Sequence, residues 1–161
     1  MKGAQFVTTD VPGATSGTIL YGINDALQLS GASGGKMTPI DAPGAWSTDA
    51  LGLNENGELV GLYVANGALN GFLLSRGAFS TIDFPGAGNT TARGINSQHQ
   101  IVGFYTSAGK AHGFLLSNGI YSTINFPGAA HTRARGINAM GTITGSYIDS
   151  NGVEHGFVAS N

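Results

Sequence analysis

The side chains best suited to chemistry gather in four short segments, each directly after a Pro-Gly-Ala corner. The segments read TSGTILY at 15–21, WSTDAL at 46–51, GNTTAR at 88–93 and AHTRAR at 130–135. They hold three of the four arginines in the chain and its only tryptophan. The candidate catalytic residues are His131, Arg135 and Arg93, and the candidate ligand-binding residues are Tyr21, Trp46, Asp49 and Arg133.

These residue types suit a small anionic or polar organic ligand. Arginine presents a rigid fork of N–H donors that matches carboxylate or phosphate, and Trp46 offers a stacking face. In a catalytic version, His131 and Asp49 supply acid and base groups, with His131 the better proton carrier, while Arg93 and Arg135 clamp an anion. Such a set could run a lyase, isomerase or cyclisation reaction on a carboxylate-bearing or phenolic substrate without a cofactor.

Several other chemistries lack their signatures in this chain. There is no cysteine, which removes disulfides, thiolate nucleophiles and Cys-ligated zinc. No HxH or HExxH motif occurs, and no serine nucleophile elbow, phosphate loop or dinucleotide fingerprint is present. The sequence therefore predicts no metal site and no cofactor.

Composition indicates an all-β fold and limits the classes of partner that we expect. The chain has 161 residues with 27 glycines, and the longest stretch without glycine is nine residues, 4–12. A helix of about 11 residues would have to include glycine, which costs roughly 1 kcal/mol relative to alanine. A net charge of −2 gives no reason to expect a nucleic-acid partner, and no apolar run is long enough to span a membrane. We expect a small-molecule or glycan ligand and leave the oligomeric state open.

Internal repetition organises the whole chain as one domain. Pro43, Pro85 and Pro127 recur at intervals of 42 residues. The copies span approximately 37–78, 79–120 and 121–161, and a shorter, degenerate copy spans approximately 6–36. Each copy contains up to four β-like runs bounded by glycine and proline, which in the third copy are 92–96, 101–106, 112–117 and 121–126.

A four-stranded meander of about 42 residues repeated in tandem is typical of a β-propeller blade. We therefore expect a small four-bladed propeller over residues 1–161. The last copy lacks its outer strand, and residues 6–11 at the N-terminus match that strand type. Pairing of 6–11 with the last blade would close the ring and remove its exposed edges. The segment after each corner would then cross between blades, and all four would converge at one mouth of the central channel.

Residues that recur in every copy are best explained by the needs of every blade. Glycines inside the predicted inner strands allow close backbone approach, and asparagines begin the turns that follow. Acidic or amide residues just before the corners are expected to cap loop amides. Recurring tyrosines should pack between blades, and the two histidines of the HGF motifs should be hydrogen-bonded structural residues. The sets are Gly22, Gly52, Gly94 and Gly136; Asn24, Asn54, Asn96 and Asn138; Asp10, Asp41, Asp83 and Asn125; Tyr63, Tyr105 and Tyr147; and His112 and His155.

The motifs GINSQHQIVGFY, HGFLLSNG and YSTINFPGA resemble the HAF-type repeats described as extracellular repeats in bacteria. The likeness covers nearly the whole chain from Phe6 and carries no general biochemical activity. It implies an exported protein, extracellular or periplasmic. The opening MKGAQFVTTDVPG has no apolar h-region, so we expect no secretory leader in this segment and leave the location open.

Three functions remain open from the sequence. The first is one asymmetric site at the channel mouth, serving a binding protein or a cofactor-free enzyme. The second is a lectin-like propeller with similar glycan pockets in each blade, which predicts exposed aromatics at the 42-residue period. Trp46 has no such counterpart, because Gly88 and Ala130 occupy the equivalent positions. The third is a structural interaction module without catalysis.

Overall fold

The chain folds into antiparallel β-sheets that follow the repeats. The computed structural model describes residues 20–23, 29–31 and 40–160. Within them, β3–β6 and β7–β10 form two four-stranded sheets, β11–β13 a three-stranded sheet, and β1–β2 a two-stranded pair. The strands are β1 (Leu20–Ile23), β2 (Leu29–Gly31), β3 (Ser47–Leu53), β4 (Leu59–Ala65), β5 (Ala68–Ser75), β6 (Ala78–Ile82), β7 (Asn89–Ile95), β8 (Ile101–Ser107), β9 (Lys110–Ser117), β10 (Ile120–Ile124), β11 (His131–Ile137), β12 (Ile143–Ile148) and β13 (Glu154–Ala159).

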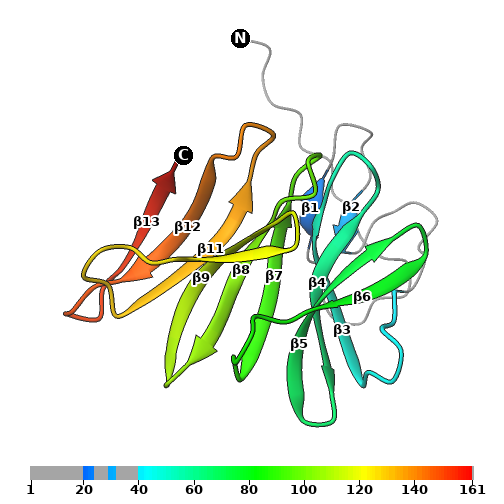
Figure 1. The fold of residues 1–161 in the computed structure, drawn as a ribbon, viewed down its shortest axis with the longest axis horizontal. Helices are drawn as coiled ribbons and strands as arrows, with labels where there is room; N and C mark the ends of the chain where they lie inside the picture. Colours follow the sequence, from blue (N-terminus) through cyan, green and yellow to red (C-terminus); the bar gives the residue numbers. More distant parts are fainter. Residues whose placement is uncertain (1–19, 24–28, 32–39, 161) are drawn as a thin grey trace.

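Consecutive sheets stand side by side in chain order (Figure 1). The first strand of each sheet lies over the middle strands of the sheet before it, so β7 contacts β4 and β5, and β11 contacts β8 and β9. Apolar side chains fill both interfaces. Val60, Ile82 and Phe114 belong to the first core cluster, and Val102 and Ala134 to the second. The all-β prediction is confirmed.

The first strands of the two four-stranded sheets, β3 and β7, each carry a glycine that lies against the backbone of the next sheet. A Cβ placed on Gly52 would lie 3.2 Å from the Cα of Gly94, and one placed on Gly94 would lie 3.1 Å from the Cα of Gly136. No side chain fits between backbones at that distance. The expectation that these glycines mark a close backbone approach is confirmed at Gly52 and Gly94.

The recurring asparagines build the turns and also join the sheets. The side-chain oxygen of Asn96 accepts the backbone N–H groups of Gln98 and Gln100, each at 3.0 Å, and Asn54 and Asn138 repeat this turn. The amide of Asn54 also donates to the backbone carbonyl of Asn96 at 3.1 Å. The turn was predicted from the sequence, whereas the bond between sheets was not.

Aromatic stacking supports the packing role of the tyrosines. The ring of Tyr105 stacks on Phe84 with centroids 3.7 Å apart, and Tyr147 stacks on Phe126 in the same way. Phe84 and Phe126 each precede the proline of a corner, so each stack joins two consecutive sheets. Tyr63 has Ala42 at the equivalent corner position and no such stack among residues 40–160, although its hydroxyl shares a hydrogen bond with Thr81 as that of Tyr105 does with Thr123.

The corners themselves are capped differently from the expectation. The hydroxyl of Thr90 accepts the backbone N–H of Phe84 at 3.0 Å, and Thr48 and Thr132 do the same at their corners. Asn125 bonds the His112 ring instead of a loop amide. At each of the three described corners, the capping threonine lies six residues after the residue whose N–H it accepts, because pairing of the following strand brings its hydroxyl back to the corner.

The segments after the three described corners are strands and not the crossing segments that the sequence suggested, while most of TSGTILY lies outside the described residues. Asn89 already pairs with Thr106, and His131 with Ile148, so GNTTAR and AHTRAR lie almost wholly in β7 and β11. The strand pairing begins directly after the tight corner and is regular up to a bulge at Arg93 in β7 and at Arg135 in β11.

Within the described residues the sheets do not close into a ring. β1 and β2 contact β3, and the β11–β13 sheet keeps three strands. Residues 6–11, expected to supply the fourth strand, lie outside the described residues. The finer prediction of a closed four-bladed propeller is taken up below as a proposal.

Candidate functional site

The predicted site residues are distributed over four strands. Arg93 lies in β7, His131, Arg133 and Arg135 in β11, and Asp49 in β3. Trp46 immediately precedes β3 and is 79% exposed. Tyr21 lies in β1, whose side chains fall outside the described part of the chain.

Arg93 and Arg135 occupy equivalent bulges in their strands. The register of β7 against β8 shifts between Ala92 and Gly94, and that of β11 against β12 shifts between Ala134 and Gly136. The extra residue in each case is an arginine. Because a bulge bends the strand and re-aims the side chain of the extra residue, these arginines do not follow the simple alternation of a strand.

Two of the arginines converge on one aromatic ring. The guanidinium carbon of Arg93 lies 5.9 Å from the ring centroid of Phe104, and that of Arg133 lies 5.6 Å from the same centroid. Both distances fall within the range of a cation–π contact. Phe104 was missed from the sequence, although it differs between copies as the chosen residues do, with Leu62 and Ser146 at the equivalent positions.

Arg135 completes this group through a polar network. Its Nε and one terminal nitrogen donate to the hydroxyl of Ser146, each at 3.3 Å, and the same terminal nitrogen lies 3.4 Å from Glu154. A hydrogen bond from Ser146 and the positive charges of Arg135 and Arg133 hold the pKa of the Glu154 carboxyl below its usual value. We call Arg93, Phe104, Arg133, Arg135, Ser146 and Glu154 the arginine cluster.

His131 lies at the start of β11, two residues before Arg133. Its Nδ1 accepts the backbone N–H of Ala111 at 3.0 Å, and Asn89 accepts the N–H of Leu69 at the equivalent place one repeat earlier. An Nδ1 that accepts a hydrogen bond carries no proton, so the neutral ring holds its proton on Nε2. This hydrogen bond joins β9 to β11 and leaves the Nε2–H of His131 as a hydrogen-bond donor.

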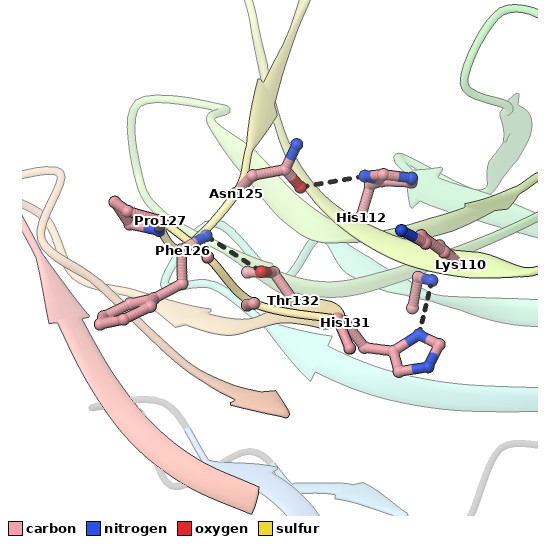
Figure 2. Close-up of a pocket in the computed structure, with 11 residues that line it drawn as sticks. Lys110, His112, Asn125, Phe126, Pro127, His131 and Thr132 are labelled. Atoms are coloured by element: carbon pink, nitrogen blue, oxygen red, sulfur yellow. Dashed lines mark hydrogen bonds between the residues drawn. The ribbon is translucent and has the colours of Figure 1, made fainter. Parts of the chain in front are cut away.

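The His131 ring borders a hollow of about 240 Å³ at the third described corner (Figure 2). We call it the corner hollow. His112, also at its wall, shares a hydrogen bond of 3.0 Å between its Nδ1 and the side-chain oxygen of Asn125, and its ring stacks on Tyr105. The lining residues are Lys110, Ala111, His112, Asn125, Phe126, Pro127, Gly128, Ala129, Ala130, His131 and Thr132.

The structure therefore brings together only part of the predicted site. Arg93, Arg133 and Arg135 belong to one cluster. His131 lies two residues before Arg133 along β11, roughly 7 Å at about 3.3 Å per strand residue, and four residues before Arg135, roughly 13 Å. Trp46 and Asp49 belong to the first four-stranded sheet and make no hydrogen bond or ion pair with these groups among residues 40–160.

Comparisons with known proteins add no further assignment, because no family model, curated protein or solved structure matches the chain. In the described part of the chain, no helix is long and apolar enough to cross a membrane. No group of three or more histidine, cysteine, aspartate or glutamate residues placed to hold a metal ion occurs in those same residues.

Proposed function

We propose that the protein binds a small organic anion at the arginine cluster. The observation that supports this most is the convergence of Arg93 and Arg133 on the Phe104 ring. A carboxylate or phosphate bound beside this ring is attracted by both positive charges and accepts N–H donors from the Arg133 fork. Phe104 adds an apolar face for the organic part of the ligand.

Arg133 is the residue best placed to take the ligand. Its side chain is half-buried and makes no hydrogen bond to any residue within 40–160. Arg135, in contrast, is already held by Ser146 and Glu154. Glu154 acts as an internal counter-ion for this part of the cluster, so an incoming anion competes with it for the positive charge.

Binding is better supported than catalysis. A cofactor-free lyase, isomerase or cyclase would use His131 as its proton carrier, with Arg93 and Arg135 as anion clamps. Arg93 lies in another sheet, and the Nδ1 of His131 would have to give up the bond to Ala111 before that nitrogen could take a proton. A glycan-binding function has the exposed ring of Trp46 as its supporting observation.

We further propose that the sheets are blades of a four-bladed propeller, closed with 6–11 as the fourth strand beside β13. One face of the β11–β13 sheet, equivalent to the faces that the next sheet covers in the two four-stranded sheets, supports closure. A Cβ on Gly113 would lie 3.3 Å from the backbone nitrogen of Ala134 in the next sheet, whereas one on the equivalent Gly156 meets nothing nearer than 3.9 Å. Val158 is 73% exposed, while the equivalent Leu115 packs against the core. This face has room for a further inner strand. We likewise propose, from the resemblance of its sequence motifs alone, that the protein is related to the exported HAF-type repeats.

A direct test measures binding of benzoate by isothermal titration calorimetry, with benzyl alcohol as the uncharged probe. Arg133→Thr removes the fork, and Thr91 already occupies the equivalent position one repeat earlier, so the strand tolerates threonine. We expect benzoate to bind the unmodified protein and to bind the variant roughly tenfold more weakly, the loss of about 1.4 kcal/mol.

The matched control is Arg76→Asn, which removes a distant arginine at the β5–β6 turn and installs the residue found at the equivalent Asn118. It should leave the affinity unchanged. Equal affinity for benzoate in the Arg133→Thr variant, or equal affinity for benzyl alcohol and benzoate, would contradict the proposed site.

A further inference from the structure

The corner hollow has a lining that differs in charge from the same corner one repeat earlier. Lys110 and Asn125 line it, and the preceding repeat carries Ala68 and Asp83 at these positions. One negative charge is therefore lost and one positive charge gained. No aspartate or glutamate is among the eleven lining residues.

The backbone of the corner is unchanged by this exchange. Thr132 caps the N–H of Phe126 at 3.0 Å, as Thr90 caps that of Phe84 one repeat earlier. The bond that His131 accepts from Ala111 has its counterpart in the bond that Asn89 accepts from Leu69. The fold thus needs neither the lysine nor the loss of the carboxylate, because the preceding repeat builds the same corner without them.

The polar groups at this hollow present donors. With Nδ1 engaged by Ala111, the neutral His131 ring carries its proton on Nε2. The side-chain oxygen of Asn125 faces His112, which leaves the amide NH₂ as its remaining group. Figure 2 shows the Lys110 side chain between the rings of His112 and His131. A volume of about 240 Å³ admits a group of several non-hydrogen atoms, since one water takes about 30 Å³.

We propose that the corner hollow is a second, separate site that binds a small oxyanion group, a phosphate or a carboxylate, through Lys110, Asn125 and His131. Charge-assisted hydrogen bonds from an ammonium to an oxyanion are among the stronger ones in proteins. The site is specific to this repeat, because only here do the lysine, the asparagine and the histidine occur together.

The test follows the ring-proton resonances of His131 by NMR during titration with inorganic phosphate and, separately, with acetate, at constant pH and ionic strength. The test variant carries Lys110→Ala and Asn125→Asp, both residues of the preceding repeat, so its unfolding midpoint should match that of the unmodified protein. We expect a saturable shift with at least one probe, weakened roughly tenfold or more in the variant.

If only phosphate saturates, the corner hollow binds an inorganic phosphate or a phosphoryl group. If only acetate saturates, it binds a carboxylate. Arg93→Leu, which installs the residue found at the equivalent Leu51, is the control for the arginine cluster and should leave these shifts unchanged, so failure at one site is distinguishable from failure at the other. Absence of a saturable shift with both probes, or equal affinity in the double variant, overturns the proposal.

Discussion

The side-chain amide of Asn96 donates to the backbone carbonyl of Asn138, 42 residues further along the chain, at 3.0 Å. Asn54 makes the same bond to Asn96, so one residue per repeat closes its own turn and ties its sheet to the next. Asn54 and Asn96 are each only 4% exposed. Buried polar groups of this kind are costly when left without partners.

We expect Asn96→Ala to lower the free energy of unfolding by about 3 kcal/mol, because it removes several buried hydrogen bonds at once. Urea denaturation followed by tryptophan fluorescence or circular dichroism measures the change. Asn138→Ala is the matched control, since Asn138 closes the same kind of turn but is exposed. Equal losses in the two variants would show that the bond between sheets contributes nothing.

Gly136 tests the closed propeller. A Cβ on Gly94 would press against the next strand at 3.1 Å, whereas one on Gly136 meets only the hydroxyl of Thr144, at 3.0 Å, among the described residues. In a closed ring, Gly136→Ala should destabilise the protein as much as Gly94→Ala, by about 1–3 kcal/mol. Thermal or urea unfolding of both variants decides this, and a Gly136→Ala variant as stable as the unmodified protein argues against closure.

Deletion of residues 1–11 should also lower the melting temperature sharply if those residues supply the closing strand.

Glu58 should give the protein a specific sensitivity to acid. It is 6% exposed, accepts hydrogen bonds of 2.7 Å from Asn54 and Ser75, and lies 2.9 Å from the ring of His99 in the next sheet. Burial raises the pKa of this carboxyl, but the two hydrogen bonds and the charge of protonated His99 outweigh burial and leave the pKa below its ordinary value. The stabilisation is therefore fully present above the unfolded pKa of about 4.3 and is lost as the pH falls through the folded value.

We expect Glu58→Gln to lower stability at neutral pH by about 1–2 kcal/mol and to flatten the loss of stability below about pH 4.5. Glutamine suits the site, because Gln100 occupies the equivalent position and accepts the same bond from Asn96 at 2.7 Å. Urea unfolding between pH 3 and pH 7 measures both effects, with the exposed Glu55→Gln as the control. If the free energy of unfolding falls as steeply at acid pH in the Glu58→Gln variant as in the unmodified protein, this carboxyl does not cause the sensitivity to acid.

Much of the fold could be predicted from the sequence because it depends on local chemistry repeated at a fixed interval. Frequent glycine excludes long helices, and Asn at the end of the first strand of each sheet forms a turn with its own backbone. The recurring Gly52 and Gly94 mark positions where no side chain fits. Each of these features acts within a few residues, or is repeated in every copy, so one chain displays it several times.

The candidate site was predicted only in part, because side-chain direction depends on strand pairing. The segments after the corners were taken for crossing loops, whereas their residues lie in β7 and β11, and Arg93 and Arg135 fall on bulges in those strands. Only the register shows which residues oppose them, and therefore that Arg93 and Arg133 share the ring of Phe104. The ring of His131, in contrast, accepts the backbone N–H of Ala111 in the preceding sheet.

The sequence by itself determined that the chain is all-β, that it is built from a 42-residue unit and that its few charged residues are unevenly placed. Only the tertiary structure decided which of those residues meet. Repetition specifies what every sheet has in common, while a unique site arises where side chains that differ between copies cross from one sheet to the next. That contact depends on bulges, register and the stacking of sheets, which no single segment encodes.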